Sequence, residues 1–202
     1  MVEKICNALI DGLTKKLTEH HLIYRLPCTS EYLEELISDS LNEAGLKNDW
    51  QPNRSHTASV DMKIKDSSIS VKSGVYDLEK ASLKFSGSRL GKHETIDQMI
   101  SHLNDTSADY YVCVAKRDQD WSPTPAKNEI KVYYLFVFDA KHLNYDSSLW
   151  NKVTTRNGGY NYEMESIGMK AKISTSLSSQ LWTTLDESIS GKPRKLVINV
   201  LD

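Results

Sequence analysis

The chain has 202 residues, of which 39% are hydrophobic and 26% charged, as in soluble proteins that bury one core without disulfides or structural metal. Its formal charge of -2 gives no global sign of nucleic-acid binding, so any basic surface must be local. The three cysteines are too far apart for a C-x-x-C metal site, and no apolar run approaches the ~18 residues of a membrane span. We therefore expect one cytoplasmic domain over residues 1–202, with no membrane partner.

Two amphipathic N-terminal helices, packed on the rest of the domain, are predicted over about residues 2–44. The second begins at Thr29 or Ser30 and stops before Gly45. Each has one apolar stripe at helical spacing, formed by Ile5, Leu9, Leu13 and Leu17 in the first helix and by Leu33, Leu36, Ile37 and Leu41 in the second. Glu34 borders the second stripe, so it either reaches a neighbouring site or is an ordinary surface acid.

A hairpin is predicted over residues 59–74, where apolar and polar residues alternate around the turn Asp66-Ser67-Ser68. Asp61 lies near the start of the first strand, and Ser70 and Lys72 share one face of the second because they are two residues apart. Phosphodiester hydrolysis needs oxygen ligands for a divalent cation and a positive group near the phosphate. The hairpin therefore suits that chemistry, although a solvated hairpin with soluble lysines explains the same pattern.

The middle of the chain predicts a strand over residues 81–86, a helix over 95–103 and a strand over 110–115. This order implies a parallel crossover, with the helix on one sheet face and the hairpin face partly free for substrate. Residues 87–93 combine small residues with Arg89, Lys92 and His93, donors that suit phosphates or guanine edges. A plain polar loop before the helix is the competing interpretation.

The C-terminal part predicts a surface loop over residues 116–128 and strands over 130–138, 168–174 and 196–201. Residues 150–162 predict a flexible loop whose Arg156 and Asn157 suit base edges, although turn chemistry also explains its Asn-Gly-Gly run. Lys170 and Lys172 share one strand face, and a phosphate-gripping helix is predicted to follow over residues 176–182.

These segments resemble type II restriction endonucleases of the PD-(D/E)XK nuclease superfamily, and the resemblance covers residues 26–182 in element order. In that superfamily an acid on one strand is followed by acid-x-Lys on the next, and here Asp61 is followed by Ser70-Val71-Lys72 and then Ser73-Gly74. The Glu34 helix before Gly45 also resembles the family's pattern. Ser70 departs from it by replacing the second acid, and Val60 stands where the family often has Pro.

The resemblance implies an α/β fold with a restriction-endonuclease-like mixed central sheet flanked by helices. It implies that Asp61, the Val71 carbonyl and Glu34 hold Mg²⁺, that Lys72 positions the attacking water, and that Ser70 holds a water of the ion. It further implies sequence-specific cleavage of double-stranded DNA by a homodimer of a restriction-modification system in a prokaryotic cytoplasm. The candidate DNA contacts are Arg89, Lys92, His93, Arg156, Asn157, Lys170 and Lys172.

Other functions fit the same residues. A structure-selective repair or junction nuclease would share the fold, and a catalytically inactive DNA-binding protein would explain the acid missing at Ser70. Glu35 and Glu79 remain alternatives to Glu34 as the acid that replaces it.

Overall fold

The computed structural model describes residues 1–52, 60–116 and 130–199. The helices are α1 (Val2–Ile23), α2 (Ser30–Glu43), α3 (Ile96–Asp105) and α4 (Glu187–Ser190), with 3-10 turns η2 (Ala140–His142), η3 (Ser147–Leu149) and η4 (Thr175–Leu177). The strands are β1 (Met62–Ile64), β2 (Ser67–Asp77), β3 (Ser82–Arg89), β4 (Tyr110–Lys116), β5 (Ile130–Asp139), β6 (Asn151–Thr154), β7 (Tyr160–Ser166), β8 (Met169–Ser174), β9 (Gln180–Asp186) and β10 (Arg194–Asn199).

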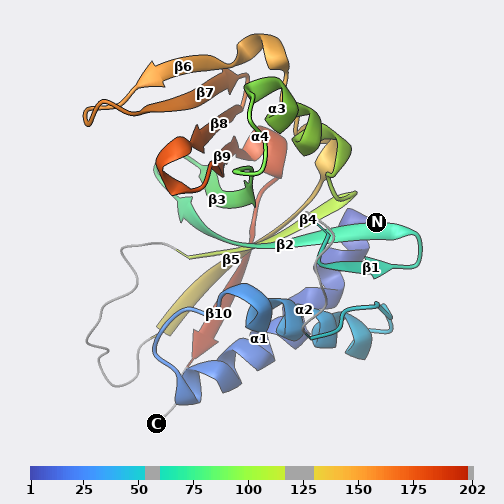
Figure 1. The fold of residues 1–202 in the computed structure, drawn as a ribbon. Coiled ribbons are helices and arrows are strands. Elements are labelled where there is room, and N and C mark those ends of the chain that lie inside the picture. The colour runs from blue at the N-terminus through green and yellow to red at the C-terminus, as the bar shows by residue number, and fades with distance from the viewer. Residues whose placement is uncertain (53–59, 117–129, 200–202) are drawn as a thin grey trace.

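All ten strands belong to one sheet, in the order β10-β5-β4-β2-β3-β9-β8-β7-β6, with β1 paired to β2. The only parallel pair among these strands is β2 with β4, so the sheet is mixed but mostly antiparallel. Figure 1 shows α1 and α2 against the β10-β5-β4-β2 part, while α3 lies on the other side, near the β6 to β9 part. The expected mixed sheet flanked by helices is therefore present.

The sheet separates two hydrophobic clusters, because successive residues of a strand point to opposite faces. Along β4, Val112 and Val114 join the cluster of α1 and α2, whereas Tyr111, Cys113 and Ala115 join the cluster of α3. The predicted stripes of the first two helices are buried in the former cluster. Those N-terminal helices thus pack on the sheet as expected.

The predicted start of α3 and both predicted ends of α2 are confirmed, whereas α1 and α3 run two or three residues further than predicted. Thr95 and Gln98 form a capping box at the start of α3, and Gly45 follows α2 with φ +78°. The hairpin is also confirmed, but its turn is Lys65-Asp66, since Ile64 pairs directly with Ser67. No helix in the described ranges is both long and apolar enough to cross a membrane.

Three predictions are wrong. The strand β3 before α3 runs antiparallel to β2, so the parallel pair is β2 with β4, and the connection between these two strands contains β3 and α3. The predicted loop over 150–162 is largely a β6–β7 hairpin, and the predicted helix over 176–182 is a short 3-10 turn followed by β9. The predictions for loop 116–128, beyond Lys116, and for the end of the last strand lie outside the described residues.

Candidate functional site

A gap between two strands on one edge of β2 holds the candidate site. The β1 strand pairs with β2 up to Ile69, whereas β3 pairs with β2 only from Gly74 onward. Both strands lie on the same edge, because β4 occupies the other edge over Ile69 to Val75. Residues 70–73 therefore lie where β1 and β3 separate, between the two hydrogen-bond ladders.

Asp61 fills this gap. Its backbone N–H donates to the Ile69 carbonyl at 2.9 Å, which extends the hairpin by one residue and turns the side chain toward β2. Its Oδ2 accepts from the Val71 N–H at 2.6 Å and from Ser70 Oγ at 3.1 Å. The carboxylate thus satisfies a backbone donor that lies between the two ladders.

Lys72 completes the cluster from the same face of β2 as Ser70. Its Nζ donates to the Val71 carbonyl at 3.0 Å and lies 3.5 Å from Asp61 Oδ2. The Lys72 and Asp61 side chains are 19% and 11% exposed, so solvent screens this ion pair only weakly. The ammonium therefore bridges two of the oxygens that the resemblance assigns to the metal.

Ser73 and Gly74 continue β2 away from the gap, and Gly74 has a packing reason. A Cβ at Gly74 would lie 2.8 Å from the Lys84 carbonyl of β3, closer than real Cβ contacts. The glycine therefore permits the close approach of β3 that closes the gap at this end.

The neighbouring strand β4 places uncharged side chains beside the gap. Tyr111 and Cys113 are the register partners of Ser70 and Lys72, and both are buried. Burial raises the pKa of the Cys113 thiol to about 12, although the nearby Lys72 ammonium acts in the opposite direction. Burial also raises the pKa of the Tyr111 phenol, and the Asp61 charge adds to that rise. Both groups therefore stay protonated at neutral pH and serve as packing beside the charged pair.

Glu34 reaches the hairpin from the side of α2. It is half-buried, as its position beside the apolar stripe predicts, and its Oε2 accepts from Trp50 Nε1 at 3.3 Å. The preceding Asp49 accepts from the Lys63 N–H of β1 at 2.6 Å. Trp50 thus links Glu34 to the outer flank of the hairpin, beside a small hollow of 190 Å³ that Glu35 also lines.

The donor set satisfies the minimal requirement of Mg²⁺. That ion binds through one or two carboxylates and keeps waters and phosphate oxygens for its remaining positions. Asp61 and the Val71 carbonyl could hold it, since Lys72 Nζ lies within 3.5 Å of an oxygen of each, whereas Glu34 contacts Trp50 on the outer flank of the hairpin. Within the described residues, no three His, Cys, Asp or Glu side chains form a ready metal-binding group. Glu79 lies in the exposed turn at the far end of β2, where its N–H bonds Asp77.

The candidate DNA contacts fall into separate places. Arg89 is the last residue of β3, and Lys92 and His93 follow it; the antiparallel register brings that end toward the Lys72 half of β2. Arg89 Nε lies 3.4 Å from Gln180 Oε1, and the His93 and His102 ring centroids are 4.6 Å apart. These three residues therefore lie at the same end of the sheet as the gap.

The remaining candidates lie on the β6 to β9 part. Arg156 and Asn157 are exposed at the tip of the β6–β7 hairpin. Lys170 and Lys172 share a face, as predicted, but the register through β9 and β3 puts that face opposite to the one that carries Lys72. Both are ion-paired, with Glu165 at 2.7 Å and Glu163 at 3.2 Å. They therefore belong to a different surface from the gap.

Sequence reasoning missed Tyr111 and Cys113, which gave no signal because the parallel β2–β4 pairing joins strands about 40 residues apart. Comparison with known proteins adds no constraint: no family model, no curated protein and no solved structure matches this chain.

Replacing Asp61 with alanine is expected to lower the free energy of unfolding by about 1–3 kcal/mol, because the Val71 N–H loses its acceptor in a half-buried gap. Urea denaturation monitored by circular dichroism measures this change. Asp66→Ala, in the exposed turn of the same hairpin, is the matched control and should change stability by less than about 0.5 kcal/mol. Equal effects of the two substitutions would contradict the bridging role of Asp61.

Proposed function

We propose that this chain is a Mg²⁺-dependent endonuclease that hydrolyses phosphodiester bonds of double-stranded DNA at specific sequences. The observation that carries the proposal is the convergence of Asp61, Ser70 and Lys72 in the gap beside β2. The order α2, β1, β2, β3, α3, β4 in a mixed sheet supports the same proposal. A restriction-endonuclease-like fold is part of it.

Each residue of the gap has a role in this proposal. Asp61, the Val71 carbonyl and Glu34 would hold Mg²⁺, which supplies Lewis-acid stabilisation of the charge on phosphate. Ser70 fixes the orientation of the Asp61 carboxylate through its 3.1 Å hydrogen bond. In the complex with DNA, Lys72 would leave the Val71 carbonyl and bind the attacking water and a phosphate oxygen. Its positive charge would there stabilise the negative charge that develops on phosphate.

DNA would approach the gap from the end of the sheet that carries Arg89, Lys92 and His93. Arg156 and Asn157, exposed at a hairpin tip, would reach base edges from a second direction. A homodimer would present two such gaps to a palindromic site, because its twofold axis matches that of the DNA.

An inactive DNA-binding protein is the second candidate, and two observations favour it. Ser70 offers no charge where a second acid would strengthen metal binding, and Lys72 already neutralises Asp61. In such a protein the Asp61–Lys72 pair would serve the hairpin alone. A structure-selective nuclease of the same fold differs from both, because it would cut branched DNA and leave linear duplex intact.

Digestion of unmodified phage DNA, with and without Mg²⁺, tests these functions. We expect discrete bands from the wild type and from Asp66→Ala, and intact DNA from Asp61→Ala. A featureless smear would mean that the protein cleaves DNA without recognising a specific sequence. Intact DNA that the protein nevertheless retards in a gel would favour the binding protein, and cutting only of branched DNA would favour the structure-selective nuclease.

A further inference from the structure

One half of a sheet face is not covered by any helix of the described residues, 1–52, 60–116 and 130–199. The cluster of α1 and α2 includes residues of β1, β2, β4, β5 and β10, and within the described chain none from β3 or from β6 to β9. On the same face, the register aligns Val75 with Lys84, Lys84 with Thr184 and Thr184 with Lys170. The face that α1 and α2 cover therefore continues as an open surface over β3, β9, β8 and β7.

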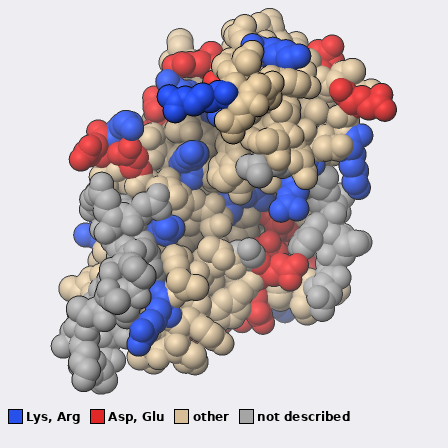
Figure 2. Space-filling view, turned by 60° about the vertical axis from the view of Figure 1, so that its left-hand side comes forward, with Lys and Arg blue, Asp and Glu red and all other residues tan. Residues whose placement is uncertain are grey.

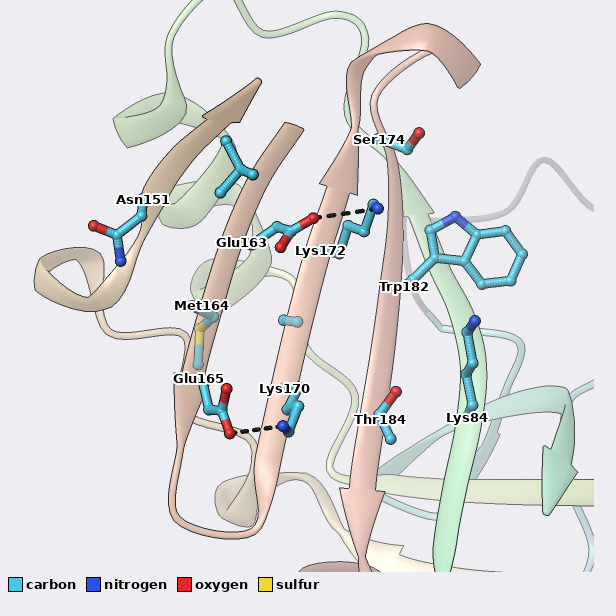
Figure 3. Close-up of a pocket in the computed structure, with 12 residues that line it drawn as sticks. Lys84, Asn151, Glu163, Met164, Glu165, Lys170, Lys172, Ser174, Trp182 and Thr184 are labelled. Carbon is cyan, nitrogen blue, oxygen red and sulfur yellow. Dashed lines mark ion pairs between the residues drawn. The ribbon is translucent and has the colours of Figure 1, made fainter. Parts of the chain in front are cut away.

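This open surface is hollowed around Lys84. Three adjoining hollows of 740, 360 and 540 Å³ all include Lys84 in their lining, and Trp182 lines the first two. Each of the three volumes lies within the range of about 300–1,000 Å³ typical of ligand sites. Figure 3 shows Lys84 and Trp182 projecting from β3 and β9, beside the ion-paired side chains of β7 and β8. Lys84 Nζ lies 5.5 Å from the centre of the Trp182 ring.

The two hollows that share Trp182 carry an excess of positive charge. Their lining includes four lysines, Lys84, Lys116, Lys170 and Lys172, against two acids, Glu163 and Glu165. The whole chain has a formal charge of -2, so this surface differs in sign from the molecule. Figure 2 shows basic side chains across the middle of one face, between the part with β6 to β9 and the part with α1 and α2.

The ion pairs on this surface are easily exchanged. The side chains of Lys170 and Glu165 are 64% and 68% exposed, and those of Lys172 and Glu163 are 46% and 41% exposed. Exposed pairs of this kind contribute about 0–1 kcal/mol, so a phosphate can replace either carboxylate at little cost. The third hollow adds Lys80 together with Asp77 and Asp186, so the positive region ends there.

A partly exposed indole beside several lysines suits one class of ligand. Proteins bind single-stranded nucleic acid by stacking bases on aromatic rings and tracking the backbone with positive charge. A duplex keeps its bases stacked on one another, so it offers Trp182 no free base. We propose that this open surface binds single-stranded nucleic acid, with a base on Trp182 and phosphates on Lys84, Lys170 and Lys172. The site lies on the sheet face opposite Lys72 and does not depend on nuclease activity.

Fluorescence anisotropy of a labelled oligothymidylate of about 12 nucleotides, titrated with the full chain at low salt, tests this site. Trp182→Leu should weaken binding by about 5- to 100-fold, the range for the loss of one stacked base. Lys84→Ala should weaken binding and lower the slope of log K against log salt by about 0.7, as for one phosphate contact. Lys141→Ala removes an exposed, ion-paired lysine that lines none of the three hollows and should leave oligonucleotide binding unchanged.

Glu163→Gln distinguishes a polyanion from a neutral ligand such as an oligosaccharide. It frees Lys172 from its carboxylate, so nucleic-acid binding should tighten. Weaker binding by this variant, unchanged binding by both Trp182→Leu and Lys84→Ala, or an equal loss of duplex binding in Trp182→Leu would overturn the proposal. Lys84 is exposed, so Lys84→Ala keeps the test valid if the Trp182 variant fails to fold. Asp61→Ala should bind the oligonucleotide normally, which separates this site from the proposed cleavage.

Discussion

Replacing Lys72 with alanine should lower the rate of DNA cleavage by about 10²–10³-fold, the loss that follows removal of one group that stabilises transition-state charge. Lys72 Nζ lies 3.5 Å from Asp61 Oδ2 and donates to the Val71 carbonyl at 3.0 Å, so its charge lies beside the proposed metal ligands. Single-turnover cleavage of supercoiled plasmid at saturating Mg²⁺ measures this rate without a contribution from product release.

Two substitutions control this experiment. Lys63→Ala removes an exposed lysine from β1 of the same hairpin and should leave the rate within about twofold, since surface changes have small effects. Lys72→Arg keeps the positive charge but replaces the compact ammonium by a larger, planar guanidinium, so we expect only partial activity. Wild-type cleavage by Lys72→Ala, with an unchanged unfolding midpoint, would remove Lys72 from the catalytic site.

The helices and the hairpin could be predicted because their signals are local. The stripe of Leu9, Leu13 and Leu17 has a helical period, and Thr95 is a residue type that often begins helices. Asp61 immediately precedes β1 and Lys72 lies on β2, and the two-residue turn between these strands brings them to the same end of the hairpin. The chemistry of the gap is therefore encoded within about a dozen residues.

The errors arose where partners are distant in sequence. Leu181, Thr183 and Leu185 alternate at strand spacing and are buried, but the preceding serines favoured a helix cap. That β9 strand forms only because β3 and β8 pair with its two edges. Propensity at a single segment cannot reveal such pairing, and tertiary context decides the structure.

The same limit applies to the candidate site. Lys170 and Lys172 lie on one strand face, as alternation predicts, but the choice of sheet face depends on the register of three intervening strand pairs. The Lys84 and Trp182 surface gave no sequence signal because its two central residues are 98 positions apart. The sheet face on which a side chain lies depends on the register of strands far apart in sequence, whereas the contacts within one hairpin depend only on neighbouring residues.

Replacing Glu34 with glutamine should raise the Mg²⁺ concentration for half-maximal cleavage by at least about 10–100-fold, the cost of losing even an outer-shell partner of a metal. Ser70 brings no charge to the gap, so Asp61 would otherwise hold the ion alone among the carboxylates assigned here. The amide keeps the hydrogen bond from Trp50 Nε1 through its oxygen, so the shape of the hollow is preserved. Cleavage rates across a Mg²⁺ titration measure the shift.

Glu35→Gln is the matched control, because this neighbouring acid is exposed and points further from the apolar stripe. Its Mg²⁺ requirement should equal that of the wild type. A shift in Glu35→Gln but not in Glu34→Gln would transfer the role to Glu35. An unchanged requirement in both, with Asp61→Ala inactive, would mean that the helix supplies no ligand and that phosphate oxygens and waters complete the coordination. Trp50→Phe removes the donor that fixes Glu34, so a smaller shift in the same direction would assign Trp50 the positioning of this acid.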